Sequence, residues 1–190
     1  MRRSFAPVAA AALLAGCGIN SVPTSEENAK ARWADVQASY QRRADLIPNL
    51  VATAKGAATF EERTLTNVTN ARARATQAQV APTDLTDPAK VQQFAAAQSA
   101  LSLAIRPLQE AYPQLQSQAN FATLMQQLEG TENRINIAVR DYNSAVQEYN
   151  TRIRTFPDAI GAKVIHGAKP LTPFQAVTPG ADRAPTVNFE

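Results

Sequence analysis

The chain is poor in the residues from which most catalytic and metal sites are built. Its 190 residues include one cysteine, Cys17, and one histidine, His166. A single cysteine excludes an intramolecular disulfide and a cysteine-based metal site. A single histidine excludes His-rich metal chemistry and a di-iron bundle, which needs a Glu-x-x-His pair on two helices. Without a Gly-rich phosphate loop or the parts of a catalytic triad, the sequence predicts neither an enzyme nor a cofactor.

Glycine and aromatic residues are also scarce, with 7 glycines, 7 Phe, 4 Tyr and 1 Trp. The composition favours Ala, Gln, Arg, Leu and Thr, which is typical of a helical protein with a slender aliphatic core. All-β architectures fit poorly. The length suits one domain that buries a hydrophobic core. The carboxylate pairs Glu61-Glu62 and Glu129 with Glu132 are interpreted as solvated charge on helix surfaces rather than as acid-base couples.

The N-terminal apolar run is too short to span a bilayer, which takes roughly 20 residues. MRRSFAPVAAAALLAGC has a basic start, an apolar stretch from Phe5 to Leu14, and small residues before Cys17. This pattern predicts a signal peptide over residues 1–16. Leu14-Ala15-Gly16-Cys17 resembles a bacterial lipobox, so we expect Cys17 to carry the lipid, including palmitate-type acyl chains, that anchors the mature protein to a membrane. The alternative is a buried or chance free thiol.

The formal charge of +3 shrinks when the signal peptide is removed. Loss of Arg2 and Arg3 leaves 17 basic residues (19 − 2) against 16 acidic ones. A nucleic-acid partner needs a basic face, so none is expected. The predicted location is the bacterial cell envelope, facing the periplasm or exterior. Gly18 stands where many inner-membrane lipoproteins of Gram-negative bacteria have Asp, which favours the outer membrane.

Hydrophobic spacing of three and four residues predicts an all-α, elongated antiparallel bundle of three long helices plus a short C-terminal helix. Thr24 and Glu27 have the spacing of a capping box and predict a helix start. The bundle is expected to cover residues 25–166, between a tether over 17–24 and a disordered tail over 167–190. Its expected long helices span about 25–80, about 88–111 starting at Pro88, and about 119–155. A short helix is expected within 158–166. The 3-4 spacing is that of coiled-coil packing. An up-down-up order would make the first and third long helices parallel.

Two charged residues fall on the inward stripes of these helices. Arg43 takes a core position in the first helix, and Glu132 takes the position between Leu128 and Ile135 in the third. A buried charge is costly unless it is paired. We therefore predict an interhelical polar network that fixes register, built on Arg43 and Glu132. Its further candidates are Asp45, Asn133 and Arg140. The alternative is that Arg43 extends its head into water along the helix surface.

Pro48 interrupts the first helix. It removes the hydrogen bond to the carbonyl of Ala44 and bends the helix, and Asn49 and Arg43 are the nearest local donors. One interpretation is that the bend only curves a long helix around its neighbours. The other is a binding site at the bend, lined by Arg42, Asp45 and Asn49, for a small anionic molecule or a cell-wall fragment.

Two groups of motifs resemble the LemA family. The first is Trp33-x-x-Val36-x-x-x-Tyr40-x-Arg42-Arg43-x-Asp45-Leu46-Ile47-Pro48-Asn49-Leu50-Val51, followed by Lys55-Gly56-x-Ala58-x-x-Glu61, Leu65, Val68 and Ala71-Arg72. The second is Tyr112-Pro113-x-Leu115, Phe121, Leu124, Leu128, Thr131-Glu132-Asn133-x-Ile135, Arg140-x-Tyr142-Asn143, Tyr149-Asn150 and Phe156-Pro157. The resemblance covers about residues 33–160. It implies a helical bundle on the outer side of a bacterial membrane without established enzymatic activity. It also implies envelope protein partners, and a scaffolding or quality-control role.

One departure from the family pattern concerns the anchor. Typical members keep the N-terminal hydrophobic segment in the membrane, whereas here it is short and ends in the lipobox. The sequence thus predicts a lipid-anchored, non-enzymatic bundle that presents helix surfaces to an envelope protein or to its own copies. The alternative remains a binding protein with its ligand at the Pro48 bend.

Overall fold

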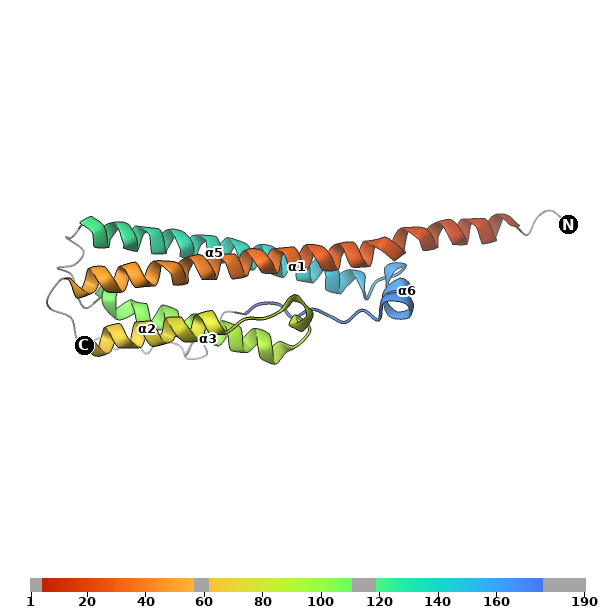
Figure 1. Cartoon of the computed structure of the whole chain (residues 1–190). Coiled ribbons are helices and arrows are strands. Elements are labelled where there is room, and N and C mark those ends of the chain that lie inside the picture. Colours follow the sequence, from red (N-terminus) through yellow and green to blue (C-terminus); the bar gives the residue numbers. More distant parts are fainter. Residues whose placement is uncertain (1–4, 57–61, 111–118, 176–190) are drawn as a thin grey trace, which may run out of the picture. The chain divides into compact units, whose positions relative to one another are not determined.

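A computed structural model describes residues 5–56, 62–110 and 119–175, with side chains over 20–56, 62–108 and 119–175 (Figure 1). The predicted all-α class is confirmed, and these residues contain no strand. The elements are α1 (Phe5–Lys55), α2 (Glu62–Gln77), the 3-10 helix η1 (Pro82–Asp84), α3 (Pro88–Glu110), α5 (Ala119–Arg152), α6 (Asp158–Gly161) and the π-helical turn η2 (Ala162–His166). The start of a helix at Pro88 and the short C-terminal helix agree with the sequence prediction.

The predicted first helix is two helices. α1 ends at Lys55, Gly56 follows it as a turn, and α2 begins at Glu62. Both helices carry the same apolar stripe, so hydrophobic spacing alone cannot reveal that the chain reverses between them. A glycine just after a helix is a common stop signal, and Gly56 was the available clue. The signature residues Ala58 and Glu61 lie outside the described residues, as do Tyr112, Pro113 and Leu115.

The predicted start of the first helix at Thr24 is also wrong. α1 begins at Phe5, so residues 17–24 are helical rather than a tether. The Thr24 hydroxyl donates to the carbonyl of Asn20 at 2.7 Å, and the Ser25 hydroxyl donates to that of Val22 at 3.0 Å. Ser and Thr can make these bonds inside a helix as well as at its start. The spacing Thr24 to Glu27 was therefore ambiguous.

The described chain divides into two compact units. Unit 1 comprises residues up to Tyr40, Ala81–Pro88 and Thr131–Pro173, and unit 2 comprises Gln41–Val80, Ala89–Gly130 and the residues from Phe174 on. The division falls inside α1 and inside α5.

Unit 1 is built on two antiparallel helical segments. Trp33 of α1 packs on Tyr142 of α5 with ring centroids 5.0 Å apart, and both residues are buried. Ser21, twelve residues before Trp33, hydrogen-bonds to Asp158, which lies beyond the end of α5. The expectation of parallel first and third helices is therefore wrong. The chain reverses once more than predicted, between α1 and α2. As a result, α5 runs in the direction opposite to the predicted one.

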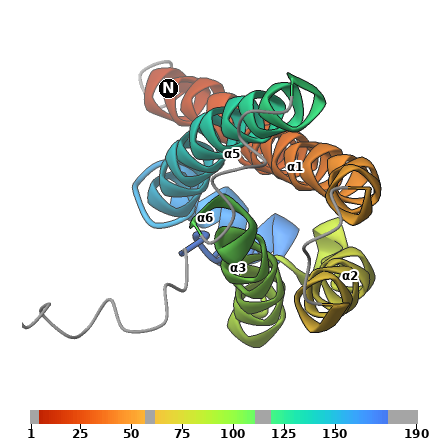
Figure 2. The ribbon, with the colours of Figure 1, turned by 90° about the vertical axis from the view of Figure 1, so that its left-hand side faces the viewer.

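Unit 2 contains four helical segments, from α1, α2, α3 and α5, which lie around a common core (Figure 2). The core is aliphatic apart from one Phe. It consists of Ile47, Leu50, Ala54, Leu65, Val68, Ala71, Ala75, Leu101, Ile105, Leu108, Phe121 and Leu128. Burial of such side chains contributes about 25 cal/mol per Å² of apolar surface. Each helix therefore depends on its neighbours for stability.

The segment after η2 is ordered, contrary to the predicted disordered tail. Gly167 ends η2 in the left-handed conformation with φ 56°, and the amide of Ala168 donates to the carbonyl of Ala162 at 2.9 Å. Leu171 and Phe174 are buried, and Phe174 packs edge-on against Phe94 within unit 2. The predicted disorder of residues 176–190 falls outside the described residues.

Candidate functional site

The charged residue at the centre of the first signature motif is buried inside unit 2. The Arg43 side chain is 1% exposed. Its Nη1 donates to Ser102 Oγ at 2.7 Å, and its Nη2 donates to the carbonyl and to Oε1 of Gln98 at 2.9 and 3.1 Å. The alternative in which Arg43 reaches into water is wrong. A guanidinium presents several donors in a fixed fork, which suits it to hold several oxygens at once.

Gln98 extends this contact to a third helix. While its Oε1 accepts from Arg43, its Nε2 donates to the carbonyl of Ala75 near the end of α2 at 3.0 Å. Carbonyls in the last turn of a helix have no partner within that helix. The chain of hydrogen bonds thus links α1, α3 and α2. A hydrogen-bond network does surround Arg43, but its oxygens come from α3, which the sequence prediction did not include. The role of this network in fixing helix register stays a prediction.

The carbonyl that Pro48 leaves without a helical donor is bound by another helix. Nε of Arg72 in α2 donates to the carbonyl of Ala44 at 2.8 Å. Proline has no amide hydrogen, so this carbonyl lacks its usual partner four residues later in α1. The sequence prediction expected Asn49 or Arg43 as donor and did not consider Arg72. The pair Ala71-Arg72 in the family signature was the only signal available.

Substitution of Arg72 is expected to be costly only while Pro48 is present. Arg72→Met should lower the free energy of unfolding by about 1–2 kcal/mol, because the buried Ala44 carbonyl would lose its donor. In a Pro48→Ala background, the introduced alanine can supply the helical amide, so the same substitution should cost less. A double-mutant cycle from urea denaturation curves measures the difference. Arg74→Met, an exposed arginine of α2, is the control. An equal cost of Arg72→Met in both backgrounds would contradict the proposed role.

The other predicted site residues of the first signature motif point outward. Arg42, Asp45, Pro48 and Asn49 are all exposed on α1 in unit 2, and Gln41 Nε2 donates to Asp45 Oδ1 at 2.7 Å. Their spacing of three and four residues places them on one side of the helix, opposite Arg43. We name these four residues the signature face. The Ala44 carbonyl near the Pro48 bend is bound by Arg72.

The second signature motif holds the extended segment after η2 in unit 1. Asn150 Nδ2 donates to the carbonyl of Leu171 at 2.8 Å, and Asn150 Oδ1 accepts from the amide of Leu171 at 2.9 Å. The hydroxyls of Tyr142 and Tyr149 donate to the carbonyls of Thr172 and Lys169 at 2.8 and 3.1 Å. Side chains thus take the hydrogen-bonding role that a neighbouring strand would have. The sequence prediction did not foresee this function for Tyr142.

The two tyrosines are well suited to this role. Burial raises the pKa of Tyr142, and burial together with the negative charge of Glu26 raises the pKa of Tyr149. Both phenols therefore stay neutral and keep their donor hydrogens throughout the ordinary pH range. The amide of Thr172 also donates to the carbonyl of Leu85 at 2.8 Å, which ties the segment to the loop before α3.

The remaining predicted residues of α5 lie at the surface. Glu132, Asn133 and Arg140 are exposed, and Asn143 is half-buried. The inward position between Leu128 and Ile135 belongs to Thr131, which is 4% exposed, rather than to Glu132. The predicted pairing of Arg43 with Glu132 stays a prediction. The side chain of Cys17 lies outside those described, although its backbone is part of α1.

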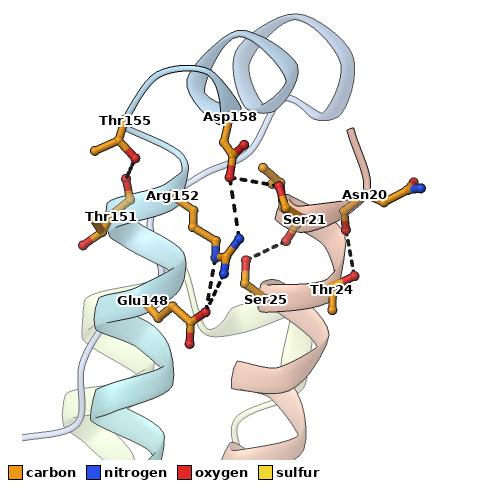
Figure 3. A network of polar contacts seen from close by, with 10 residues as sticks. Asn20, Ser21, Thr24, Ser25, Glu148, Thr151, Arg152, Thr155 and Asp158 are labelled. Carbon is orange, nitrogen blue, oxygen red and sulfur yellow. Dashed lines mark hydrogen bonds and ion pairs between the residues drawn. The ribbon is translucent and has the colours of Figure 1, made fainter. Parts of the chain in front are cut away.

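A polar cluster joins the early turns of α1 to the end of α5 in unit 1 (Figure 3). Asp158 Oδ2 accepts from the Ser21 hydroxyl at 2.9 Å and lies 3.7 Å from Arg152 Nη1. Arg152 Nη2 also lies 2.9 Å from Glu148 Oε1. The geometry serves to hold two chain segments together, since these groups are arranged around one another rather than around an open space.

Within the described residues, no group of three or more His, Cys, Asp or Glu side chains could hold a metal ion. Among the same residues, no helix is both long and apolar enough to cross a membrane. The clusters described above bind helices and backbone of the chain itself. Fold and site together define an all-α bundle with a buried network around Arg43. Asn150, Tyr142 and Tyr149 form a clamp on the extended segment after η2.

Comparison with known families identifies this class. The model of the LemA family matches residues 32–189, and the chain belongs to that family. The match includes the segment that Asn150 holds, which extends the resemblance found from motifs at about 33–160. The predicted lipobox, Leu14-Ala15-Gly16-Cys17, lies before the matched residues. No curated protein matches the chain.

Proposed function

We propose that this chain is a lipid-anchored, non-enzymatic helical bundle of the bacterial envelope that binds a protein partner, or a second copy of itself, through the signature face. The observation that carries the proposal is the division of the first motif into two sides. Arg43 is buried and holds α3, whereas Arg42, Asp45, Pro48 and Asn49 are exposed. The packing of unit 2 explains the presence of Arg43 in the motif. Packing does not explain the four exposed residues, because exposed residues away from special contacts add little to stability. Recognition of a partner would explain them.

The chemistry of the signature face suits a protein partner. It offers a guanidinium, a carboxylate and an amide on one helical segment, beside an exposed proline ring. Arginine beside polar and apolar groups is typical of protein interfaces. The alternative of a small anionic ligand at the Pro48 bend has less support, because its predicted lining residues, Arg42, Asp45 and Asn49, are exposed on one helix face, whereas small-molecule sites are concave and enclose most of the ligand.

The lipid anchor is tested at Cys17. A chain made in cells fed an alkyne analogue of palmitate should become labelled, and Cys17→Ser should not, because the thiol that receives lipid is then missing. Gel fluorescence after coupling of a dye measures the label. Asn20→Ala, an exposed position outside the lipobox, is the matched control and should label normally. Label retained in Cys17→Ser would contradict the anchor.

The signature face is tested by photo-crosslinking in living cells. A photo-reactive amino acid at position 45 or 49 should give a discrete adduct, because these side chains would lie in the interface. The same residue at Gln92, which is exposed on α3 of the same unit, should not. Mass spectrometry of the adduct distinguishes an envelope protein from a second copy. Equal adducts from positions 45, 49 and 92 would contradict recognition by this face.

A further inference from the structure

Unit 1 carries a concentration of exposed apolar side chains around α6 and η2. Six large hydrophobic side chains are exposed among those described, and four of them lie between residues 156 and 165. Phe156 is 82% exposed, Ile160 59%, Val164 77% and Ile165 57%. We name these four residues the apolar end. Isolated exposed hydrophobic residues are ordinary, but four in so short a segment indicate a contact surface.

The apolar end is fixed to the first turns of α1 that follow Cys17. Asp158, inside this segment, accepts a hydrogen bond from Ser21 at 2.9 Å (Figure 3). Cys17 precedes Ser21 by four residues in the same helix. Four helical residues advance the chain by about 6 Å. A lipid on Cys17 would therefore be attached about one helical turn along α1 from Ser21, the residue that binds Asp158.

The charge around the apolar end suits the surface of an anionic membrane. Arg154, Lys163 and Lys169 are exposed. The acidic residue in this segment, Asp158, is engaged by Ser21 and Arg152. Basic side chains beside exposed apolar ones are typical of surfaces that insert shallowly between lipid headgroups.

We propose that the apolar end lies in the headgroup layer of the membrane to which Cys17 is attached. This proposal rests on the lipid anchor of the proposed function. Because residues 17–24 are helical, and Val22 and Ser25 are buried, no flexible tether separates the anchor from the folded unit. Unit 1 then stands directly on the bilayer, with Phe156, Ile160 and Val164 among the lipids. A second protein copy on this surface is the competing occupant.

The test uses the full chain, processed and acylated in cells, purified in detergent and reconstituted into vesicles. The vesicles contain phosphatidylethanolamine and phosphatidylglycerol, with a spin-labelled phosphatidylcholine as quencher. Acylation blocks the only natural thiol, so Val164→Cys provides one reactive site for a fluorophore. Ile137→Cys is the matched control, since Ile137 is a 43% exposed hydrophobic residue on α5 of the same unit. Thermal melts of both variants establish that the fold is kept.

We expect several-fold stronger quenching of the label at position 164 than at 137, and Ile160→Cys should repeat the result at 164. Equal, weak quenching in protein that floats with the vesicles would overturn the proposal and leave the anchor intact. A label at 164 that is shielded from water but not quenched by lipid would also overturn it, in favour of a protein copy on this surface. Failure of the parent chain to float would overturn the anchor, and the membrane contact with it.

Discussion

Replacing Arg43 with alanine is expected to lower the free energy of unfolding by about 3–5 kcal/mol. The substitution removes a large buried side chain and leaves the oxygens of Gln98 and Ser102 without their charged donor. Arg43→Met keeps most of the volume and should cost less, about 1–3 kcal/mol, because only the polar groups are then left unsatisfied. Urea denaturation followed by far-UV circular dichroism measures both values.

Arg42 provides the control for Arg43, since it is the same residue type one position earlier and is exposed. Arg42→Ala should change the free energy of unfolding by no more than about 0.5 kcal/mol. Unchanged thermal stability and unchanged oligomeric state in Arg43→Met would contradict the role of the network in fixing helix register. A second test is Gln98→Leu, which should cost less in the Arg43→Met background than in the wild type, because only the wild type then keeps a buried guanidinium that loses its acceptor Oε1, whereas the Ala75 carbonyl loses its donor in both.

Replacing Asn150 with aspartate is expected to release the extended segment after η2. The aspartate keeps an acceptor for the amide of Leu171, but it replaces the donor Nδ2 and places a negative charge against the Leu171 carbonyl. Loss of one partly buried hydrogen bond and creation of this repulsion should lower the free energy of unfolding by about 2–3 kcal/mol. Hydrogen exchange with mass spectrometry should show faster exchange over residues 168–175, with little change in α2 or α3.

Gln147→Glu is the control for Asn150→Asp, because it makes the same chemical change at an exposed position of α5. It should leave exchange over residues 168–175 unaltered. If Asn150→Asp also leaves that exchange unaltered, Asn150 does not hold the segment, and the tyrosine hydroxyls and the buried Leu171 and Phe174 side chains must do so without it.

The arginine network and the clamp share a physical design. In both, a polar side chain donates to a backbone carbonyl that has no donor within its own helix or segment. Arg72 and Gln98 bind the carbonyls of Ala44 and Ala75 in unit 2, and Asn150 binds that of Leu171 in unit 1. A buried carbonyl without a partner costs about 1–3 kcal/mol. The polar side chains of Arg72, Gln98 and Asn150 thus hold neighbouring elements together.

The sequence by itself determined a good deal of this structure. Spacing of three and four residues is a property of single helices, so it correctly predicted the all-α class, most of α3 and α5, and the burial of Arg43 on an apolar stripe. Proline at position 48 also predicted an orphaned carbonyl at Ala44, because the loss of an amide is local chemistry.

Only the tertiary structure decided which groups meet. The 3-4 stripe continues from α1 into α2, so it could not show the reversal near Gly56, and the orientation of α5 was predicted incorrectly as a result. Donors such as Arg72, and acceptors such as Gln98, lie 28 and 55 residues from their partners. Hydrophobic periodicity determines which side of a helix is buried. It carries no information about which other helix covers that side, since this depends on chain reversals and on long-range contacts.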